Sequence, residues 1–406
     1  MENLTHIPVL RFPEFSGEWE SKKINEITSY VDYRGKTPEK SDSGIFLITA
    51  RNIREGYIDY ECSKEYIPVE NYEEVMRRGK PLIGDVLITT EAPCGNIASI
   101  DKEGIALAQR VIKFRGKENI YNYFLKFYFL SDFFQKKLFE KATGGTVKGI
   151  KGSQLHKMIV KFPTLPEQQK VADFLTQIDN KINQLAKKKQ LLERYKKGVM
   201  QQIFSQEIRF TDDDGREFPE WEEKKLGDIG ENIIGLTYSP NDIDNENGII
   251  VLRSSNIKND IIKLDDLVKV NTNISDRLLI KKNDIVICTR NGSQRLIGKN
   301  IIIRDIDIPM TFGAFMSVFR SSQNEFVYHL FKTDSYNEQI QANLGARINQ
   351  ITNKNLNAFK FSFPCPEEQT KIANFLTALD EKIALVEKQL NGTKQYKKGL
   401  LQQLFI

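Results

Sequence analysis

The sequence of 406 residues contains only four cysteines, three histidines and two tryptophans. Cys62, Cys94, Cys288 and Cys365 lie far apart and form no Cys-x-x-Cys pair, which argues against a disulfide framework and against a cysteine zinc cluster. A reducing compartment is the natural expectation. The scarcity of histidine removes the side chain that most often serves as general base or metal ligand, so we expect no metal site.

Long apolar runs and a leader-like amino terminus are also missing. No stretch of 18 apolar residues occurs, and residues 1–10 contain no basic region followed by an apolar one. These absences favour a soluble, cytoplasmic chain that neither spans a membrane nor is secreted. The sequence also lacks HExxH, GxSxG and GxGxxG patterns and the Asn-Pro-Pro-aromatic segment of amino-methyltransferases. A binding protein without a catalytic site is therefore favoured over an enzyme.

The composition is that of a folded protein. Hydrophobic residues make up 40% of the chain and charged residues 28%, which is enough material for two or three domains with buried cores. The formal net charge of +5 is mild. It permits an anionic partner such as nucleic acid without requiring one.

The second half of the chain repeats the first at a displacement of roughly 200 residues. Phe162-Pro163 followed by Glu167-Gln168 is answered by Phe363-Pro364 followed by Glu368-Gln369, and the same spacing extends to two Tyr-Lys-Lys-Gly segments that begin at Tyr195 and Tyr396. The preceding parts of the two halves match more weakly. Two related modules are therefore expected to do the same kind of work on different targets. We expect globular parts at 1–164 and 207–365, each followed by a helical part, at 165–206 and 366–406.

Each helical part carries the apolar stripe of a coiled coil. In the first, Val171, Ile178, Leu185, Leu192 and Val199 are spaced seven apart. The simplest arrangement pairs the two helices antiparallel, as a rod between the globular parts; the alternative is that each helix packs on its own domain. The expected seam consists of Val171, Phe174, Ile178, Leu185, Leu192 and Val199, with Ile372, Phe375, Leu379, Val386 and Leu400 in the second helix.

The globular parts read as mixed α/β structure. Apolar runs predict strands at 45–49, 86–90, 249–252, 284–289 and 301–303, and helical spacing predicts helices at 121–141 and 325–344. Aromatic side chains crowd residues 121–134. At this spacing they favour a buried core over a platform that stacks on bases.

Several polar side chains are of the types that read DNA, because arginine matches the edge of guanine and asparagine or glutamine that of adenine. The glycine-rich segment 143–151 could also bring Lys148 and Lys151 to phosphates, although a flexible glycine turn explains it equally well. The candidates for DNA binding are Arg34, Lys36, Arg51, Asn52, Arg77, Arg78, Gln109, Arg110, Lys148 and Lys151 in the first half, and Arg253, Asn256, Arg290, Asn291, Gln294, Arg295 and Arg347 in the second.

Taken together, these features resemble the DNA-specificity subunit of type I restriction-modification systems. The resemblance is carried by the twofold repeat, the Gly144-Gly145-Thr146 loop, Pro166-Glu167-Gln168-Gln169 at the start of a helix, and Gly35-Lys36-Thr37-Pro38. It implies that each globular part is a target recognition domain for one half of a bipartite, gapped DNA site. The paired helices would act as a spacer and as the docking surface for two modification subunits.

The resemblance also implies where the chemistry resides. The modification subunits would use S-adenosylmethionine to methylate adenine, and two restriction subunits would use ATP and Mg²⁺, while this chain would bind no cofactor. The second copy departs from the first, with Ala346-Arg347 in place of Thr146-Val147, so different half-sites are expected. Two alternatives stay open: a stand-alone DNA-cleaving enzyme, and a coiled-coil adaptor that binds only proteins.

Overall fold

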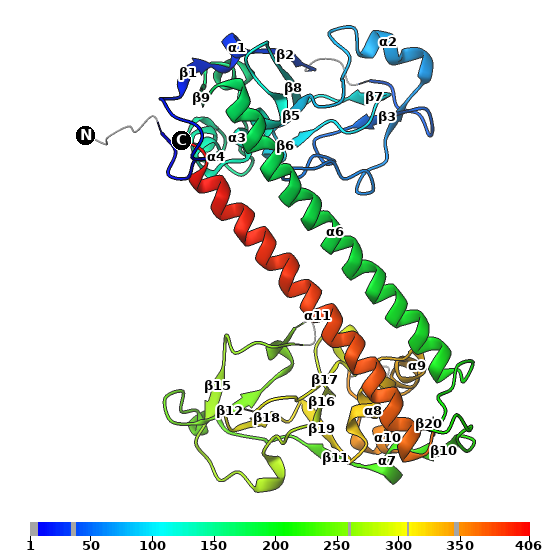
Figure 1. Cartoon of the computed structure of the whole chain (residues 1–406). Coiled ribbons are helices and arrows are strands. Elements are labelled where there is room, and N and C mark those ends of the chain that lie inside the picture. The colour runs from blue at the N-terminus through cyan, green and yellow to red at the C-terminus, as the bar shows by residue number, and fades with distance from the viewer. Residues whose placement is uncertain (1–6, 34–37, 259–260, 307, 345–348) are drawn as a thin grey trace. The chain divides into compact units, whose positions relative to one another are not determined.

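The computed structural model describes residues 7–33, 38–258, 261–306, 308–344 and 349–406 (Figure 1). The chain divides into two compact units: the first contains Met1–Lys187 and Glu387–Ile406, and the second contains Lys188–Val386. Each unit holds one mixed α/β domain together with parts of two long helices. The expected fold class is confirmed.

The first domain is built on two small sheets. The antiparallel sheet has the order β2-β8-β5-β6, and the other sheet has the order β4-β3-β7, in which β3 and β7 are parallel. A separate antiparallel pair joins β1 to β9. The strands are β1 (Glu20–Lys23), β2 (Thr28–Asp32), β3 (Ile45–Ile48), β4 (Tyr66–Ile67), β5 (Val86–Thr90), β6 (Cys94–Ser99), β7 (Ile105–Leu107), β8 (Val111–Gly116) and β9 (Ile159–Phe162).

The second domain repeats this topology strand for strand. Its sheets have the orders β11-β19-β16-β17 and β15-β12-β18, with β12 parallel to β18, and β10 pairs with β20. A short β13-β14 pair is added. The strands are β10 (Glu222–Lys225), β11 (Glu231–Ile234), β12 (Ile249–Leu252), β13 (Ile257–Lys258), β14 (Ile261–Ile262), β15 (Val268–Val270), β16 (Ile285–Cys288), β17 (Asn300–Ile302), β18 (Met310–Phe312), β19 (Met316–Arg320) and β20 (Lys360–Phe363).

Apart from α2, the helices also recur in pairs. The short ones are α1 (Ile24–Ile27), α2 (Tyr72–Val75), α3 (Asn122–Leu130), α4 (Asp132–Lys141), α5 (Gly152–Leu155), α7 (Leu226–Ile229), α8 (Asn324–Leu330), α9 (Asp334–Ala342) and α10 (Asn353–Ala358), and the 3₁₀ turns are Val69–Asn71, Pro240–Asp242, Ser254–Asn256, Asp276–Leu278 and Gln294–Leu296. The long ones are α6 (Leu165–Phe204) and α11 (Pro366–Gln403). Their ends agree closely with the expected helical parts, but the compact units cut across them, so the four-part division stays an interpretation.

The two helices expected at 121–141 and 325–344 are each broken, which corrects the sequence reading. Ser131 lies between α3 and α4 with extended backbone, and its hydroxyl accepts a hydrogen bond from the amide of Phe134. Thr333 does the same for Tyr336 between α8 and α9. Serine and threonine favour this capping position over a helix interior. Each break therefore divides the expected helix into two short ones.

The aromatic cluster of residues 121–134 forms core, as expected, since Phe124, Phe127, Tyr128, Phe129 and Phe134 are all buried. The central strands supply the other side of this core. All five residues of β5 and all four of β16 are buried, which explains why they read as continuous apolar runs.

The start of one long helix and the end of the other share a core in each unit. In the first unit, Val171 and Leu175 of α6 join the same buried cluster as Leu400 and Leu404 near the end of α11. In the second unit, the roles are exchanged. The helices therefore run antiparallel within each unit. Of the expected seam, Val171, Ile178, Leu185, Ile372, Val386 and Leu400 are buried, and Phe174, Leu192, Val199, Phe375 and Leu379 are half-buried.

A buried carboxylate fixes the start of each long helix. Glu167 accepts two hydrogen bonds from the guanidinium of Arg11, at 2.8 and 2.7 Å, and a third from the indole of Trp19 at 3.4 Å. Glu368 is bound in the same way by Arg209 and Trp221. A carboxylate is also favoured at the positive end of the helix dipole. The Glu-Gln pair of the repeat therefore has a structural role.

The last residues of the chain complete the core of the first domain. The ring of Phe405 packs against Trp19, Phe124 and Tyr128, with centroid distances of 6.5, 5.5 and 5.9 Å. The hydroxyl of Tyr128 donates to the carbonyl of Ile406 at 3.1 Å. Figure 1 shows the carboxyl terminus beside α3 and α4. Burying one phenylalanine contributes about 2–3 kcal/mol.

Helix α8 of the second unit contains a buried histidine, which its counterpart α3 in the first unit lacks. His329 on α8 lies 3.1 Å from the hydroxyl of Thr377 through Nε2, and 3.9 Å from the carboxylate of Asp380 through Nδ1. Burial lowers its pKa to about 3, and the nearby charge of Lys196 adds to this effect more strongly than those of Arg304 and Lys332. The histidine is therefore neutral in the folded protein. Phe127 occupies the corresponding position on α3.

His329 is expected to make the second unit sensitive to acid. The unfolded chain binds a proton at this residue below pH of about 6.5, whereas the folded chain does not until its pKa near 3, so stability falls as pH falls between these values. The slope for one proton is about 1.4 kcal/mol per pH unit. His329→Phe introduces the residue of the other repeat. It should make the stability of the second unit, measured by hydrogen exchange of α8, nearly independent of pH in this range. An unchanged slope would contradict the assignment.

Candidate nucleic-acid interface

Three of the expected DNA-binding residues of the first domain come together at one cavity. Arg51, Gln109 and Arg110 line a hollow of about 210 Å³, together with Lys40 and Thr49. Arg51 follows β3, and Gln109 and Arg110 follow β7, which is the parallel neighbour of β3. The carboxyl ends of the two parallel strands therefore place these side chains side by side. Two arginines and an amide in one hollow suit the edge of a base or a phosphate.

The glycine-rich segment lies against the end of β5. Thr143 and Gly149 exchange two backbone hydrogen bonds, and Gly144 has a φ of +119° that a side chain would not tolerate in this tight turn. The segment is thus a turn closed by hydrogen bonds. Lys148 and Lys151 are exposed on and after it. Their contact with phosphates stays a prediction.

In the second domain the candidates cluster after β16. Arg290 lies with its guanidinium carbon 4.9 Å from the centre of the Phe315 ring, and Asn291 donates to the hydroxyl of Ser254 at 2.8 Å. Gln294 and Arg295 follow on an exposed 3₁₀ turn. Phe315 was not among the residues expected from the sequence, because an isolated phenylalanine usually signals core.

Two expected contacts are corrected by the structure. Asn52 and Asn256 are buried, and their carboxamides hold the loops after β3 and β12. Asn52 accepts from the amide of Thr49 at 3.0 Å and donates to the carbonyl of Ser63 at 2.8 Å, while Asn256 accepts from the amide of Arg253 at 3.0 Å. Their polar groups are used inside the domain because a buried amide must be paired. They position the neighbouring residues rather than face solvent.

The remaining candidates do not join these clusters. Arg78 donates to the carbonyl of Asp32, and Arg77 beside it is exposed. The guanidinium of Arg253 donates to the backbone carbonyl of Asp266 at 2.7 Å and to the carboxylate of Asp266 at 3.2 Å. Arg34, Lys36 and Arg347 lie outside the residues that the structure describes.

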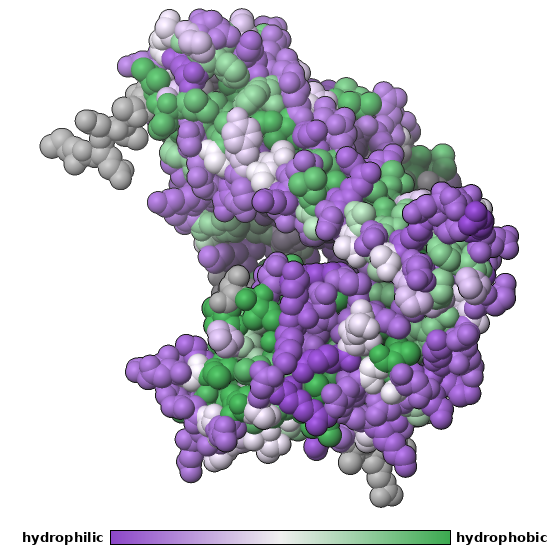
Figure 2. All heavy atoms as spheres, turned by 60° about the horizontal axis from the view of Figure 1, so that its bottom comes forward, coloured by the Kyte–Doolittle hydropathy of each residue, from purple (hydrophilic) through white to green (hydrophobic). Residues whose placement is uncertain are grey.

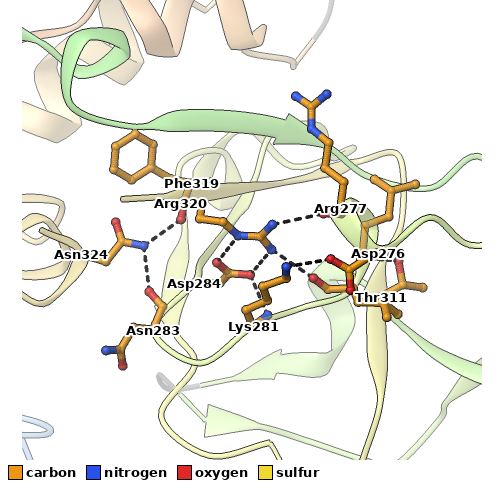
Figure 3. A network of polar contacts seen from close by, with 11 residues as sticks. Asp276, Arg277, Lys281, Asn283, Asp284, Thr311, Phe319, Arg320 and Asn324 are labelled. Atoms are coloured by element: carbon orange, nitrogen blue, oxygen red, sulfur yellow. Dashed lines mark hydrogen bonds and ion pairs between the residues drawn. The ribbon is translucent and has the colours of Figure 1, made fainter. Parts of the chain in front are cut away.

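A buried aspartate directly precedes the central strand of each domain. In the second domain, Asp284 accepts two hydrogen bonds from Arg320 on β19, at 2.8 and 2.6 Å, and one from the amide of Lys281 at 2.7 Å. Figure 3 shows the guanidinium and the carboxylate lying edge to edge. Asn324 of α8 braces the same corner by donating to the carbonyls of Asn283 and Phe319.

The first domain has the same arrangement with one additional charge. Asp85 pairs with Arg115 at 2.6 Å and also with Lys113 at 3.2 Å, while the amide of Leu82 donates to it at 2.9 Å. Burial by itself would raise the pKa of Asp85, but the hydrogen bonds from Arg115 and Leu82 and the charges of Lys113 and Arg115 together lower it. In the second domain, Val318 occupies the position of Lys113.

A second repeated feature lies on the long helices. Tyr195 and Tyr396, at equivalent positions, have exposed fractions of 55% and 57%. Gly198 and Gly399 follow one turn later on the same face. Beyond the helix's own turns, no atom of the described residues lies within 4 Å of where a Cβ of either glycine would be. A glycine inside a helix costs about 1 kcal/mol relative to alanine. No contact among the described residues explains that cost.

Comparison with known proteins decides the family. The type I restriction modification DNA specificity domain matches twice, at residues 16–194 and 219–395. This chain belongs to that family. It is the specificity subunit of a type I restriction-modification system.

Similar proteins match the specificity subunit over nearly its full length or over part of it. The type I restriction enzyme MjaVIII specificity subunit of Methanocaldococcus jannaschii is 24% identical, over 99% of this chain and 95% of that protein. The type I restriction enzyme EcoKI specificity subunit of Escherichia coli is 30% identical over 36% of this chain and 33% of that one. The crystal structure of the S subunit from M. genitalium has the same fold, with a TM-score of 0.62, 16% identity and coverage of 98% and 99%.

One face of the specificity subunit is seen to be mostly polar. On the face drawn in Figure 2, hydrophilic side chains predominate and apolar ones are scattered among them. Among the described residues, no helix is long and apolar enough to cross a membrane. The same described residues contain no group of three or more histidine, cysteine, aspartate or glutamate side chains that could hold a metal ion.

Replacing the buried aspartate should destabilise the first domain more than the second. Asp85→Asn leaves Arg115 and Lys113 without a counter-charge, and Lys113 is only 7% exposed, so the cost is expected to be about 3–5 kcal/mol. Asp284→Asn leaves only one partly exposed arginine, Arg320, without its counter-charge, so the loss of stability should be smaller. Hydrogen exchange of β5 and β16 in the full chain, followed as urea rises, measures both.

The matched control is Lys113→Val, which copies the second domain and retains the pair of Asp85 with Arg115. It should leave the first domain folded. Equal losses for Asp85→Asn and Asp284→Asn would show that the second cation has no effect.

Proposed function

We propose that this specificity subunit reads a bipartite, gapped DNA sequence, one part with each domain. The observation that carries the proposal is the combination of one strand topology with two different sets of exposed polar side chains. The first domain gathers Arg51, Gln109 and Arg110 at the ends of its parallel strands, and the second presents Arg290 and Arg295 after β16. Similar frames with different side chains suit two different half-sites.

The division of labour within the interface follows from the chemistry of the side chains. Arginine and glutamine on the strand ends are suited to base edges in the major groove. Lysines such as Lys148 and Lys151 on the turn after α4 are suited to phosphates, which fix position without carrying sequence information. Binding is therefore expected to weaken steeply as salt rises, because neutralised phosphates release counterions.

The catalytic steps belong to partner subunits in this proposal. Two modification subunits bind S-adenosylmethionine and methylate adenine, and two restriction subunits use ATP and Mg²⁺ to cut unmodified DNA. This chain contributes recognition and assembly, and no catalytic group. The proposal rests on membership of the family and on the resemblance of the sequence, since type I systems combine these activities in one complex.

The repeated face of the long helices is suited to docking the modification subunits. Tyr195 with Gly198 and Tyr396 with Gly399 keep identical side chains on exposed helix surface, whereas the domains have diverged. Tyrosine is enriched at interfaces, and a glycine allows the close approach of another backbone. Two copies of one surface on one chain imply two copies of one partner.

Mapping of adenine methylation tests the proposed recognition. The chain and its modification subunit are expressed together in a host that lacks other adenine methylation, and the genome is sequenced for modified bases. A two-part motif with unread bases between its parts and one methylated adenine in each part is expected. Unchanged methylation despite a stable complex with an active modification subunit would favour the adaptor interpretation. Metal-dependent cleavage by the purified chain alone would favour the stand-alone enzyme.

Substitution of the helix glycines tests the docking face. Gly198→Ala should stabilise the helix by up to about 1 kcal/mol. The added methyl should nevertheless hinder the docking of one modification subunit, and Gly399→Ala that of the other. Native mass spectrometry should then show one bound modification subunit for each single variant and none for the double variant.

Gly392→Ala is the matched control. Gly392 also lies inside a long helix with open space around it, but its counterpart in the first repeat is Leu191. This variant should gain stability and still bind two modification subunits. Full binding by the Gly198→Ala, Gly399→Ala double variant would remove the docking role from this face.

A further inference from the structure

Three separate segments of the first domain meet at the carboxyl end of β5. The amide and the hydroxyl of Thr90 donate to the carbonyl of Arg110, at 2.9 and 3.2 Å, and the carbonyl of Thr90 accepts from the amide of Ile150 at 2.9 Å. Arg110 belongs to the segment after β7, and Ile150 to the end of the glycine-rich turn. Thr90 thus joins all three segments.

The second domain builds the same junction from different residues. The amide and the hydroxyl of Thr289 donate to the carbonyl of Phe315, at 3.0 and 3.1 Å, and the carbonyl of Thr289 accepts from the amide of Ile351 at 2.9 Å. Phe315 follows β18, as Arg110 follows β7. The three hydrogen bonds correspond one to one, so the two domains share one backbone arrangement at this point. We call it the threonine junction; it comprises Thr90, Arg110 and Ile150 in the first domain and Thr289, Phe315 and Ile351 in the second. The threonine and the isoleucine are kept in both domains, and all four of these residues are buried.

The side chains carried by the threonine junction differ completely in charge. The residue after the threonine is Glu91 in the first domain, where it pairs by a backbone bridge with Gly149, and Arg290 in the second, where it pairs with Gln350. Across from it stands Arg110 in the first domain and Phe315 in the second. The first domain therefore presents an acid beside an arginine, and the second an arginine beside a phenylalanine.

The two pairs are held differently, but both remain accessible. The guanidinium of Arg110 approaches the carboxylate of Glu91 through Nε at 3.7 Å, which leaves its outer edge available, and the side chain is 50% exposed. Phe315 is 55% exposed under the guanidinium of Arg290. More than half of the ring is therefore open to contact from outside the domain.

The backbone of Arg110 adds a second sign of a functional role. Its φ of +70° lies in the left-handed region, which residues other than glycine, asparagine and aspartate rarely adopt. The hydrogen bonds from Thr90 hold its carbonyl in this conformation. Such strain persists where the surrounding structure enforces it, and it gathers at ligand-binding sites. Here it turns the arginine toward the cavity that Arg51 and Gln109 also line.

We propose that the two variable positions of each threonine junction determine which bases the half-sites carry. In the first domain, Arg110 binds the edge of a guanine and Glu91 orients its guanidinium. In the second domain, Arg290 binds a guanine and Phe315 contacts the methyl group of a neighbouring thymine. Both pairings match the hydrogen-bonding and apolar groups of the major groove. The inference rests on the proposed function and goes beyond it by naming the residues that discriminate.

The experiment compares methylation by the full chain with its modification subunit on DNA libraries randomised at every base of the motif. Phe315→Ala should lower the preference at one position of one half-site about 10-fold or more, with the other half-site unchanged. Arg110→Ala should do the same at one position of the opposite half-site. Arg290→Lys keeps the charge but removes the planar fork, so the preference should fall while the salt dependence of binding stays.

Two exposed residues of the same domains serve as controls. Ile261 is as exposed as Phe315, and Arg54 is an exposed arginine that pairs with Asp59, as Arg110 pairs with Glu91. Ile261→Ala and Arg54→Ala should leave both half-sites unchanged. The inference is overturned, and the proposed function is kept, if the unchanged chain directs a motif and Phe315→Ala and Arg110→Ala leave that motif intact. A loss of preference spread equally over both half-sites has the same consequence. If the unchanged chain directs methylation to no motif at all, both the inference and the proposed function fail.

Discussion

Each domain depends on a helix end that the other repeat supplies. The core of the first domain contains Leu400, Leu404 and Phe405, and that of the second contains Met200 and Ile203. A single repeat would expose this apolar surface, and such a loss would consume much of the margin of a few kcal/mol by which domains are stable. The carboxylates of Glu167 and Glu368 then fix where each helix leaves its domain. The duplication is thus a mechanical requirement of the fold as well as a means to read two sequences.

The backbone of the two domains tolerates different surface charges because buried side chains hold it in place. The buried aspartates Asp85 and Asp284 and the amides Asn52 and Asn256 satisfy backbone groups at the corners where strands begin and loops turn. The partners of the two asparagines are mostly main-chain atoms, which any sequence provides, and each aspartate keeps an arginine partner, Arg115 or Arg320. Surface positions do not have to pair with buried polar groups, and at these positions the two domains have diverged.

The sequence was informative where a signal repeats and uninformative where a role depends on contacts distant in the chain. The repeat, the long helices and the buried aromatic cluster could be read from spacing alone. The breaks at Ser131 and Thr333 could not, since the apolar spacing continues across them and only a capping hydroxyl marks the break. Asn52 has the side chain of a base reader, and only its burial reveals a structural role. Phe315 was missed for the opposite reason, because its type suggests core and only its exposure points elsewhere.

The position of the last residues has a consequence for the order of folding during synthesis. The first domain leaves the ribosome early, but Phe405 and Ile406, which close its core, are made only after the whole second domain. The second domain receives its borrowed helix end, Met200 to Phe204, before its own strands are made. The domain that is translated second can therefore close first, while its predecessor waits with an open apolar face. A premature stop in the final turn of α11 would damage the oldest part of the nascent chain and spare the newest.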